Sequence, residues 1–178
     1  MSSQVLLDCT LRDGGYYNSW DFNDSLIHDY LLAMKAVRVD VVELGFRSTD
    51  KKGFKGACAY STDAFIRTLD VPEGITFCVM INASDILVKG KYNEKILSTL
   101  FPETSKTSRV SLVRIACHTG EFFEALPAFE FLNSKGYKVA FNLMQVSECE
   151  PEELKLLSKE ATKYPFSVLY FADSLGNM

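Results

Sequence analysis

The residues best suited to chemistry lie in one short segment near the N-terminus, from Leu7 to Gly15. Its hydrophobic start gives way to a glycine-ended turn that carries Asp8, Arg12 and Asp13. A carboxylate beside an arginine stays ionised at neutral pH and can bind a divalent cation, while the guanidinium can stabilise a developing oxyanion. The alternative is an aspartate–arginine pair that only closes the turn, and this segment alone supports both interpretations equally.

Further polar residues stand near the ends of later hydrophobic runs. Period-two alternation puts Glu43 on the same strand face as Gly45, and Arg114 on the same face as His118. Parallel α/β folds assemble their active sites at the carboxyl ends of their strands. The pattern therefore predicts that these side chains converge on one site, which favours an enzyme.

Glu43 interrupts the apolar run from Val39 to Phe46, where an unpaired carboxylate would be costly. It is predicted to meet a metal ion, a protonated partner or Arg12, and an Arg12–Glu43 ion pair is the preferred prediction. His118 ends the fourth predicted strand, where it either orients substrate and transfers a proton or simply caps a helix.

Length and composition predict one domain over residues 1–178, because 47% hydrophobic residues suffice for a sizeable core. The net charge of −4 leaves no basic face for nucleic acid, and the apolar runs are too short to cross a membrane. No secretory signal precedes the first strand, so the cytoplasm is the expected location. The five cysteines contain no Cys-x-x-Cys pair and are expected to be reduced.

Strand and helix patterns alternate along the chain, which predicts a parallel α/β architecture. Six strands are expected, at residues 5–7, 39–46, 75–81, 110–117, 138–145 and 168–172. The length suits an open doubly wound sheet, since a complete TIM barrel needs about 250 residues. However, no Gly-x-Gly-x-x-Gly follows the first strand, so a partial barrel is the preferred prediction.

The segment from Asp8 to Gly14 reads Asp-Cys-Thr-Leu-Arg-Asp-Gly and resembles the Asp-x-Thr-Leu-Arg-Asp-Gly signature of metal-dependent aldolases and lyases. That TIM-barrel family includes hydroxymethylglutaryl-CoA lyase, isopropylmalate synthase and 4-hydroxy-2-oxovalerate aldolase. Val42 to Gly45, Arg114 to Thr119 and Tyr170 to Gly176 are similar to strand ends of the hydroxy-oxovalerate aldolase branch. The resemblance implies the N-terminal portion of a barrel, about six of eight βα units, in a chain truncated after the sixth strand.

The resemblance also implies roles for three residues. Asp13 would bind a divalent cation and contact substrate, Arg12 would hold the enolate oxygen, and Glu43 would position Arg12. Mg²⁺ or Mn²⁺ is expected, because a site built mostly of oxygens suits hard cations. The family completes its metal site with a His-x-His on a seventh strand, and this chain ends at Met178 before such a strand. Asp13 is therefore the one ligand expected here.

Three more residues are expected to contact substrate, namely Tyr16, His118 and Ser174. Tyr16 either walls the pocket or covers the first loop. Ser174 matches a substrate-contacting serine of the aldolase branch, or it caps a strand-to-helix turn. That branch carries a histidine base shortly after Asp-Gly, where this chain has Tyr16, Tyr17 and Asn18. The catalytic base is therefore unassigned.

These features together predict a divalent-metal-dependent carbon–carbon lyase or aldolase that acts on a 2-oxo acid or related acyl substrate through an enolate. The alternatives are an acyl-CoA condensing enzyme of the isopropylmalate synthase type and a non-catalytic barrel domain. A six-stranded piece of a barrel has two unpaired strand edges and an uncovered inner face. We therefore expect a homodimer or a larger homo-oligomer.

Overall fold

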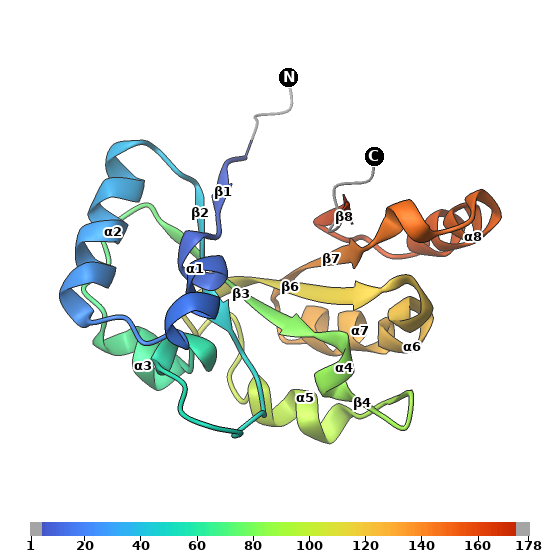
Figure 1. The fold of residues 1–178 in the computed structure, drawn as a ribbon, viewed down its shortest axis with the longest axis horizontal. Coiled ribbons are helices and arrows are strands. Elements are labelled where there is room, and N and C mark those ends of the chain that lie inside the picture. Colours follow the sequence, from blue (N-terminus) through green and yellow to red (C-terminus); the bar gives the residue numbers. More distant parts are fainter. Residues whose placement is uncertain (1–4, 174–178) are drawn as a thin grey trace.

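The computed structural model describes residues 5–173. Six parallel strands form one sheet in the order β1-β2-β3-β6-β7-β8 (Figure 1). Their bounds are β1 (Leu7–Asp8), β2 (Val41–Phe46), β3 (Thr76–Asn82), β6 (Val110–His118), β7 (Lys138–Met144) and β8 (Val168–Ala172). A separate antiparallel pair is formed by β4 (Leu87–Val88) and β5 (Lys91–Tyr92). Each strand of the main sheet pairs with its neighbour in chain order, whereas a doubly wound sheet reverses direction at one point. The prediction of an incomplete α/β barrel is therefore confirmed.

Helices flank the curled sheet, and α1 (Thr10–Asn18) lies beside β1 and β2 and not in the outer layer (Figure 1). The other helices are α2 (Asp24–Ala36), α3 (Asp63–Thr68), α4 (Ala83–Ile86), α5 (Glu94–Leu100), α6 (Phe122–Ala125), α7 (Pro127–Ser134) and α8 (Pro151–Ala161). Short 3-10 helices occur at η1 (Ala57–Ala59), η2 (Thr119–Glu121) and η3 (Val146–Glu148). Asn23 caps α2, since its side chain accepts a hydrogen bond from the Leu26 amide at 2.8 Å. Within residues 5–173, no helix is long and apolar enough to span a membrane.

The two faces of the sheet carry different side chains. The outer face forms the main core with the helices, and its strand residues include Val42, Leu44, Val79, Ile81, Val113 and Ile115. The inner face has two smaller apolar clusters, one containing Val41, Cys78, Leu112 and Ala140, and the other Phe46, Met80 and Ala116. Glu43 and Arg114 lie between these clusters along their strands and are both buried. A charged layer therefore crosses the inside of the partial barrel.

A β-bulge near the end of β2 changes which residues face inward. Glu43 pairs with Cys78 and Phe46 with Met80, so β2 has one more residue than β3 over this stretch. Phe46 consequently joins the inner face, and Gly45 turns toward the Cys58 carbonyl. A Cβ on Gly45 would lie 1.9 Å from that oxygen. The prediction that Glu43 and Gly45 share a face is therefore wrong.

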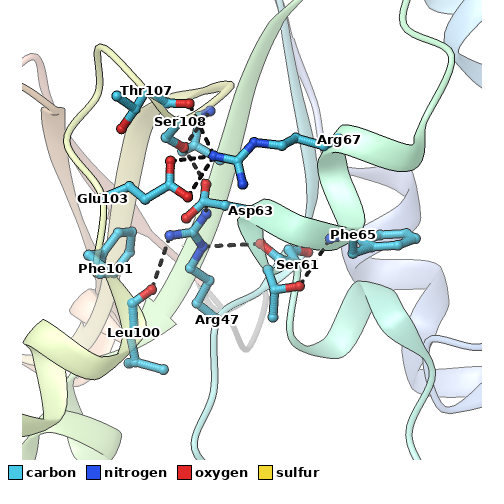
Figure 2. Close-up of polar contacts among 12 residues, drawn as sticks. Arg47, Ser61, Asp63, Phe65, Arg67, Leu100, Phe101, Glu103, Thr107 and Ser108 are labelled. Carbon is cyan, nitrogen blue, oxygen red and sulfur yellow. Dashed lines mark hydrogen bonds and ion pairs between the residues drawn. The ribbon is translucent and has the colours of Figure 1, made fainter.

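The loop after β2 is anchored by Arg47, which is buried on the outer side of the sheet (Figure 2). Its Nη2 donates to Asp63 Oδ1 at 2.7 Å, its Nε to the Ser61 carbonyl at 3.1 Å, and its Nη1 to the Leu100 carbonyl at 3.0 Å. The guanidinium also lies 4.7 Å from the centre of the Phe101 ring. These contacts fix both ends of the 47–62 segment relative to α3 and α5.

Candidate active site

The signature segment forms the start of α1 instead of an open turn. Arg12 and Asp13 lie in its first turn, directly after Cys9. The indole Nε1 of Trp20 donates to the Arg12 carbonyl at 2.9 Å. The Trp20 ring packs against Gly15, where a Cβ would lie 1.9 Å from Trp20 Cδ1. Glycine at this position thus allows Trp20 to hold the backbone that carries Arg12.

The predicted Arg12–Glu43 ion pair is confirmed. Arg12 Nε donates to Glu43 Oε1 at 2.5 Å, and the Glu43 side chain is fully buried. Arg114 Nη1 donates to both Glu43 oxygens, at 3.0 and 2.9 Å. One carboxylate thus serves two guanidiniums, and this trio carries one net positive charge. Asp13, whose side chain is 56% exposed, offsets that charge through a 2.7 Å contact with Arg12 Nη1.

Arg114 belongs to the site, although the sequence predicted only that it shares a strand face with His118 and gave it no partner. Its side chain is 9% exposed, and its guanidinium lies 4.5 Å from the centre of the Tyr170 ring. Among the described residues, no protein atom hydrogen-bonds to the buried Arg114 Nε. The available signal was a charge inside the apolar run 110–117, which is the same signal that identified Glu43.

A cavity of about 320 Å³ lies at the carboxyl ends of the strands, next to this cluster. Its polar lining comes from Arg12, Asp13, Asn82, Arg114 and Asn142. Tyr16 also lines the cavity, in agreement with the pocket-wall interpretation, and its ring centre lies 4.8 Å from that of Trp20. The cavity can therefore offer two guanidiniums and two amides to an anionic ligand.

One predicted substrate contact, His118, is not brought to this cavity. His118 is exposed at the end of β6, and its backbone amide donates to Glu121 Oε2 at 3.0 Å where it caps η2. It is not among the cavity's lining residues. Ser174 lies outside the described residues. Arg12, Asp13, Tyr16 and Glu43 are the predicted residues that the structure brings together.

The signature's first aspartate has a different position. Asp8 accepts a hydrogen bond from the Tyr30 hydroxyl and another, at 2.9 Å, from the Thr10 amide. Burial raises the pKa of Asp8, but the hydrogen bonds from Tyr30 and Thr10 outweigh it and lower this pKa below its ordinary value. Burial, followed by the Asp8 hydrogen bond, raises the pKa of Tyr30. Asp8 thus ties α2 to the start of α1 and does not line the cavity.

Asp13 is the carboxylate placed to meet a cation in the cavity. It is already engaged by Arg12 and by the Cys9 thiol, whose Sγ lies 3.2 Å from Asp13 Oδ2. Burial, then the hydrogen bond to Asp13, raises the pKa of Cys9, which keeps it a thiol. Over residues 5–173, no group of three or more His, Cys, Asp and Glu side chains is arranged to hold a metal ion. One paired carboxylate and two amides do not by themselves complete a shell for Mg²⁺ or Mn²⁺.

Comparison with known proteins identifies two curated relatives, although no family model matches the chain. The chain is 22% identical over 180 residues to oxaloacetate decarboxylase from Mycobacterium tuberculosis (strain ATCC 25618 / H37Rv), covering 97% of this chain and 48% of the relative. It is 26% identical over 173 residues to 4-hydroxy-2-oxovalerate aldolase 6 from Rhodococcus jostii (strain RHA1), covering 96% and 46%. The chain thus spans about half the length of the curated relatives it matches.

Solved structures support the same resemblance. The N-terminal domain of a candidate aldolase from Bacteroides vulgatus has a TM-score of 0.72 and 26% identity, over 93% of this chain and 62% of that one. HMG-CoA lyase from Bacillus subtilis has a TM-score of 0.68 and 13% identity, over 98% and 60%, which shows the fold alone. The resemblance to the metal-dependent aldolase and lyase family that the Asp8-to-Gly14 signature predicted is therefore confirmed in sequence and in fold.

Proposed function

We propose that this chain forms part of a carbon–carbon lyase that acts on 2-oxo acids through an enolate. The observation that carries the proposal is the Arg12 guanidinium, which Glu43 fixes beside a cavity at the carboxyl ends of the strands. A preorganised donor in that place stabilises negative charge as it develops on a substrate oxygen.

The two curated relatives are named for 2-oxo acids, oxaloacetate and 4-hydroxy-2-oxovalerate. Cleavage of the C3–C4 bond in either compound moves the bonding electron pair toward C3 and the C2 carbonyl oxygen, which produces pyruvate enolate. The other fragment is CO₂ from oxaloacetate, or acetaldehyde from the hydroxy acid once its hydroxyl proton is removed. Protonation at C3 then gives pyruvate. One oxyanion site therefore serves both reactions.

In this proposal Arg12 donates to the developing enolate oxygen, an interaction that is stronger in the transition state than with the neutral ketone. Glu43 is a positioning residue, because it touches Arg12 and Arg114 and is itself fully buried. Arg114 and the amides of Asn82 and Asn142 contribute donors for the substrate carboxylate.

A divalent cation, Mg²⁺ or Mn²⁺, belongs to the proposal with Asp13 as its one assigned ligand. When bound it would polarise the C2 carbonyl as a Lewis acid. The roles given above to Arg12, Glu43 and Arg114 do not depend on it. We also propose a cytoplasmic, homo-oligomeric protein. Exposed apolar side chains beside the edge strands support the second point, since Leu6 and Phe171 are both about half exposed.

The test is binding of oxalate, a planar dianion that resembles pyruvate enolate. Trp20 is the only tryptophan and packs beside Tyr16 at the cavity wall, so its fluorescence reports occupancy. Arg12→Lys should weaken oxalate binding roughly tenfold, or about 1.4 kcal/mol, because an ammonium cannot reproduce the planar fork. The matched control, exposed Arg38→Lys, should bind as the unmodified chain does. Equal affinity in Arg12→Lys would refute the proposed oxyanion site.

Turnover can be measured in parallel as pyruvate release from oxaloacetate and from 4-hydroxy-2-oxovalerate, coupled to lactate dehydrogenase, with and without Mn²⁺. A protein-free blank corrects for the spontaneous loss of CO₂ from oxaloacetate. Pyruvate release above that blank is expected from the protein that contains this chain, and its absence with both compounds would contradict the proposed reaction.

A further inference from the structure

A second cavity of about 210 Å³ adjoins the first. The two cavities share Tyr16, Phe46 and Asn82 as lining residues and therefore lie side by side. Trp20 completes an aromatic wall, with its ring centre 4.8 Å from that of Tyr16 and 5.6 Å from that of Phe46. A ligand held by the guanidiniums of the first cavity would extend along this wall into the second.

The far end of the second cavity is polar and carries one net negative charge. It contains Ser48, Asp50, Lys55 and Asp85. Lys55 Nζ is paired with Asp50 Oδ2 at 2.7 Å, and Ser48 Oγ donates to Asp85 Oδ2 at 3.0 Å. The charge of Lys55 is thus matched by Asp50, and Asp85 is the acidic group left over. Burial raises the pKa of Asp85, and the nearby Asp50 charge adds to this effect, while hydrogen bonds from Ser48 and Asn82 and the charge of Lys55 oppose it.

The loop that supplies Ser48, Asp50 and Lys55 is fixed in place, and Asp85 lies on α4. Arg47 anchors its two ends to α3 and α5 (Figure 2). In the middle of the loop, the Gly56 amide donates to the Ser19 carbonyl at 2.8 Å, and a Cβ on Gly56 would lie 2.2 Å from the Trp20 carbonyl oxygen. The loop is therefore closely packed on the segment that follows α1, and the second cavity exists before any ligand binds.

We propose that the second cavity holds the substrate atoms beyond C4, which oxaloacetate lacks, and that it selects an uncharged tail ending in a hydroxyl over one ending in a carboxylate or phosphate. This inference rests on the proposed function. The aromatic wall packs on the methylene part of the tail, and Asp85 accepts the hydrogen bond of the terminal hydroxyl. An anionic tail would meet the surplus negative charge, which acts as a repulsive element against it. Asp85 is then a specificity-determining residue.

Three ligands that share the 2-oxo acid head but differ at the tail test this inference: 5-hydroxy-2-oxopentanoate, 2-oxopentanoate and 2-oxoglutarate. Their dissociation constants are measured on the 178-residue chain by Trp20 fluorescence. The hydroxylated ligand should bind tightest. 2-Oxoglutarate should bind weakest, with a dissociation constant roughly tenfold higher than that of 2-oxopentanoate, because its second carboxylate would lie beside a like charge.

Variants of opposite sign test the charge argument. Asp85→Asn should reduce the ratio of the dissociation constants of 2-oxoglutarate and 2-oxopentanoate, which is called the gap below. Lys55→Gln should increase this gap, because the substitution leaves the charge of Asp50 uncompensated. Glu94→Gln removes an exposed carboxylate of α5 that does not line the cavity, and it should leave the gap unchanged. Far-UV circular dichroism confirms that each variant is folded.

The outcomes separate this inference from the proposed function. Equal binding of the three ligands, together with oxalate binding that depends on Arg12, would overturn the tail selection and leave the lyase proposal standing. Failure of oxalate and of all three ligands to bind would overturn both. A gap that stays the same in Asp85→Asn and in Lys55→Gln would also overturn the inference, because the second cavity would then not contact the tail.

Discussion

Replacing Glu43 with glutamine tests the buried charge cluster most directly. Glutamine keeps the size and shape of the side chain but removes its negative charge. Arg114 then loses charged contacts at 3.0 and 2.9 Å, and Arg12 loses one at 2.5 Å. Glu43 is fully buried and Arg114 is 9% exposed, so water cannot replace the missing carboxylate around Arg114.

The expected loss follows from the cost of leaving a buried charge without its partner, about 3–5 kcal/mol. The glutamine carbonyl still accepts one hydrogen bond, which favours the lower end, about 3 kcal/mol. That is a large share of a typical unfolding free energy of about 5–15 kcal/mol. With a denaturant slope of about 2 kcal/mol per molar urea, the unfolding midpoint should fall by roughly 1.5 M.

Urea unfolding followed by far-UV circular dichroism and by the fluorescence of Trp20 measures this change. Glu152→Gln is the matched control, because Glu152 is exposed on α8 and lies 3.6 Å from Lys155 across one helical turn. It should change the unfolding free energy by no more than about 0.5 kcal/mol. A loss below about 1 kcal/mol for Glu43→Gln would refute the view that this carboxylate compensates two guanidiniums. A double variant with Arg114→Met should recover part of the loss, since it removes the uncompensated buried charge.

Four other expectations follow from the structure. Gly45→Ala should lower the free energy of unfolding by about 1–3 kcal/mol, because its methyl group would lie 1.9 Å from the Cys58 carbonyl oxygen; an unchanged melting temperature would show that the loop can move aside. The Tyr30 hydrogen bond helps to hold the pKa of Asp8 below its unfolded value, so Asp8 contributes stability above about pH 4 that is lost as the pH falls. Tyr30→Phe should therefore raise the midpoint of acid unfolding measured by circular dichroism, and an identical midpoint would contradict this role. Asp13→Ala should abolish the weak Mn²⁺ binding expected of the chain in isothermal titration, whereas an unchanged affinity would exclude Asp13 as a ligand. The exposed apolar residues beside the edge strands should produce a dimer or larger species in sedimentation at micromolar concentration, and a clean monomer would count against the oligomer.

Much of the barrel scaffold is readable from local sequence patterns. The run predicted as a strand at 39–46 is a strand from Val41 to Phe46, and the helix before it, α2, begins where Asn23 can cap it. These elements follow from apolar periodicity and capping chemistry, which act over a few residues. The buried Arg12–Glu43 pair was also predictable, because an isolated carboxylate in an apolar run needs a partner.

The features that shape the cavity were not predictable in this way. The extra residue in β2 places Phe46 on the inner face, and Gly45 beside it packs against Cys58, a contact between β2 and η1. Helix α1 includes two glycines, and glycine has a low intrinsic helix propensity. The segment is nevertheless helical, and Trp20 packs on its Gly15 and donates to its Arg12 carbonyl. Tertiary contacts overrode local preference at both places.

The hydrogen bonds of Arg47 determine which residues of the loop after β2 can change without loss of its position. Two of these three hydrogen bonds go to backbone carbonyls, those of Ser61 and Leu100, which every amino acid provides. The side chains between the anchored ends can therefore change without loss of those two bonds. Replacing the 48–60 segment with that of a relative would exchange Ser48, Asp50 and Lys55 at the second cavity, while the charged cluster at Glu43 and the α4 residue Asp85 stay intact. Evolution and protein engineering can thus alter substrate preference at this loop separately from the reaction performed beside it.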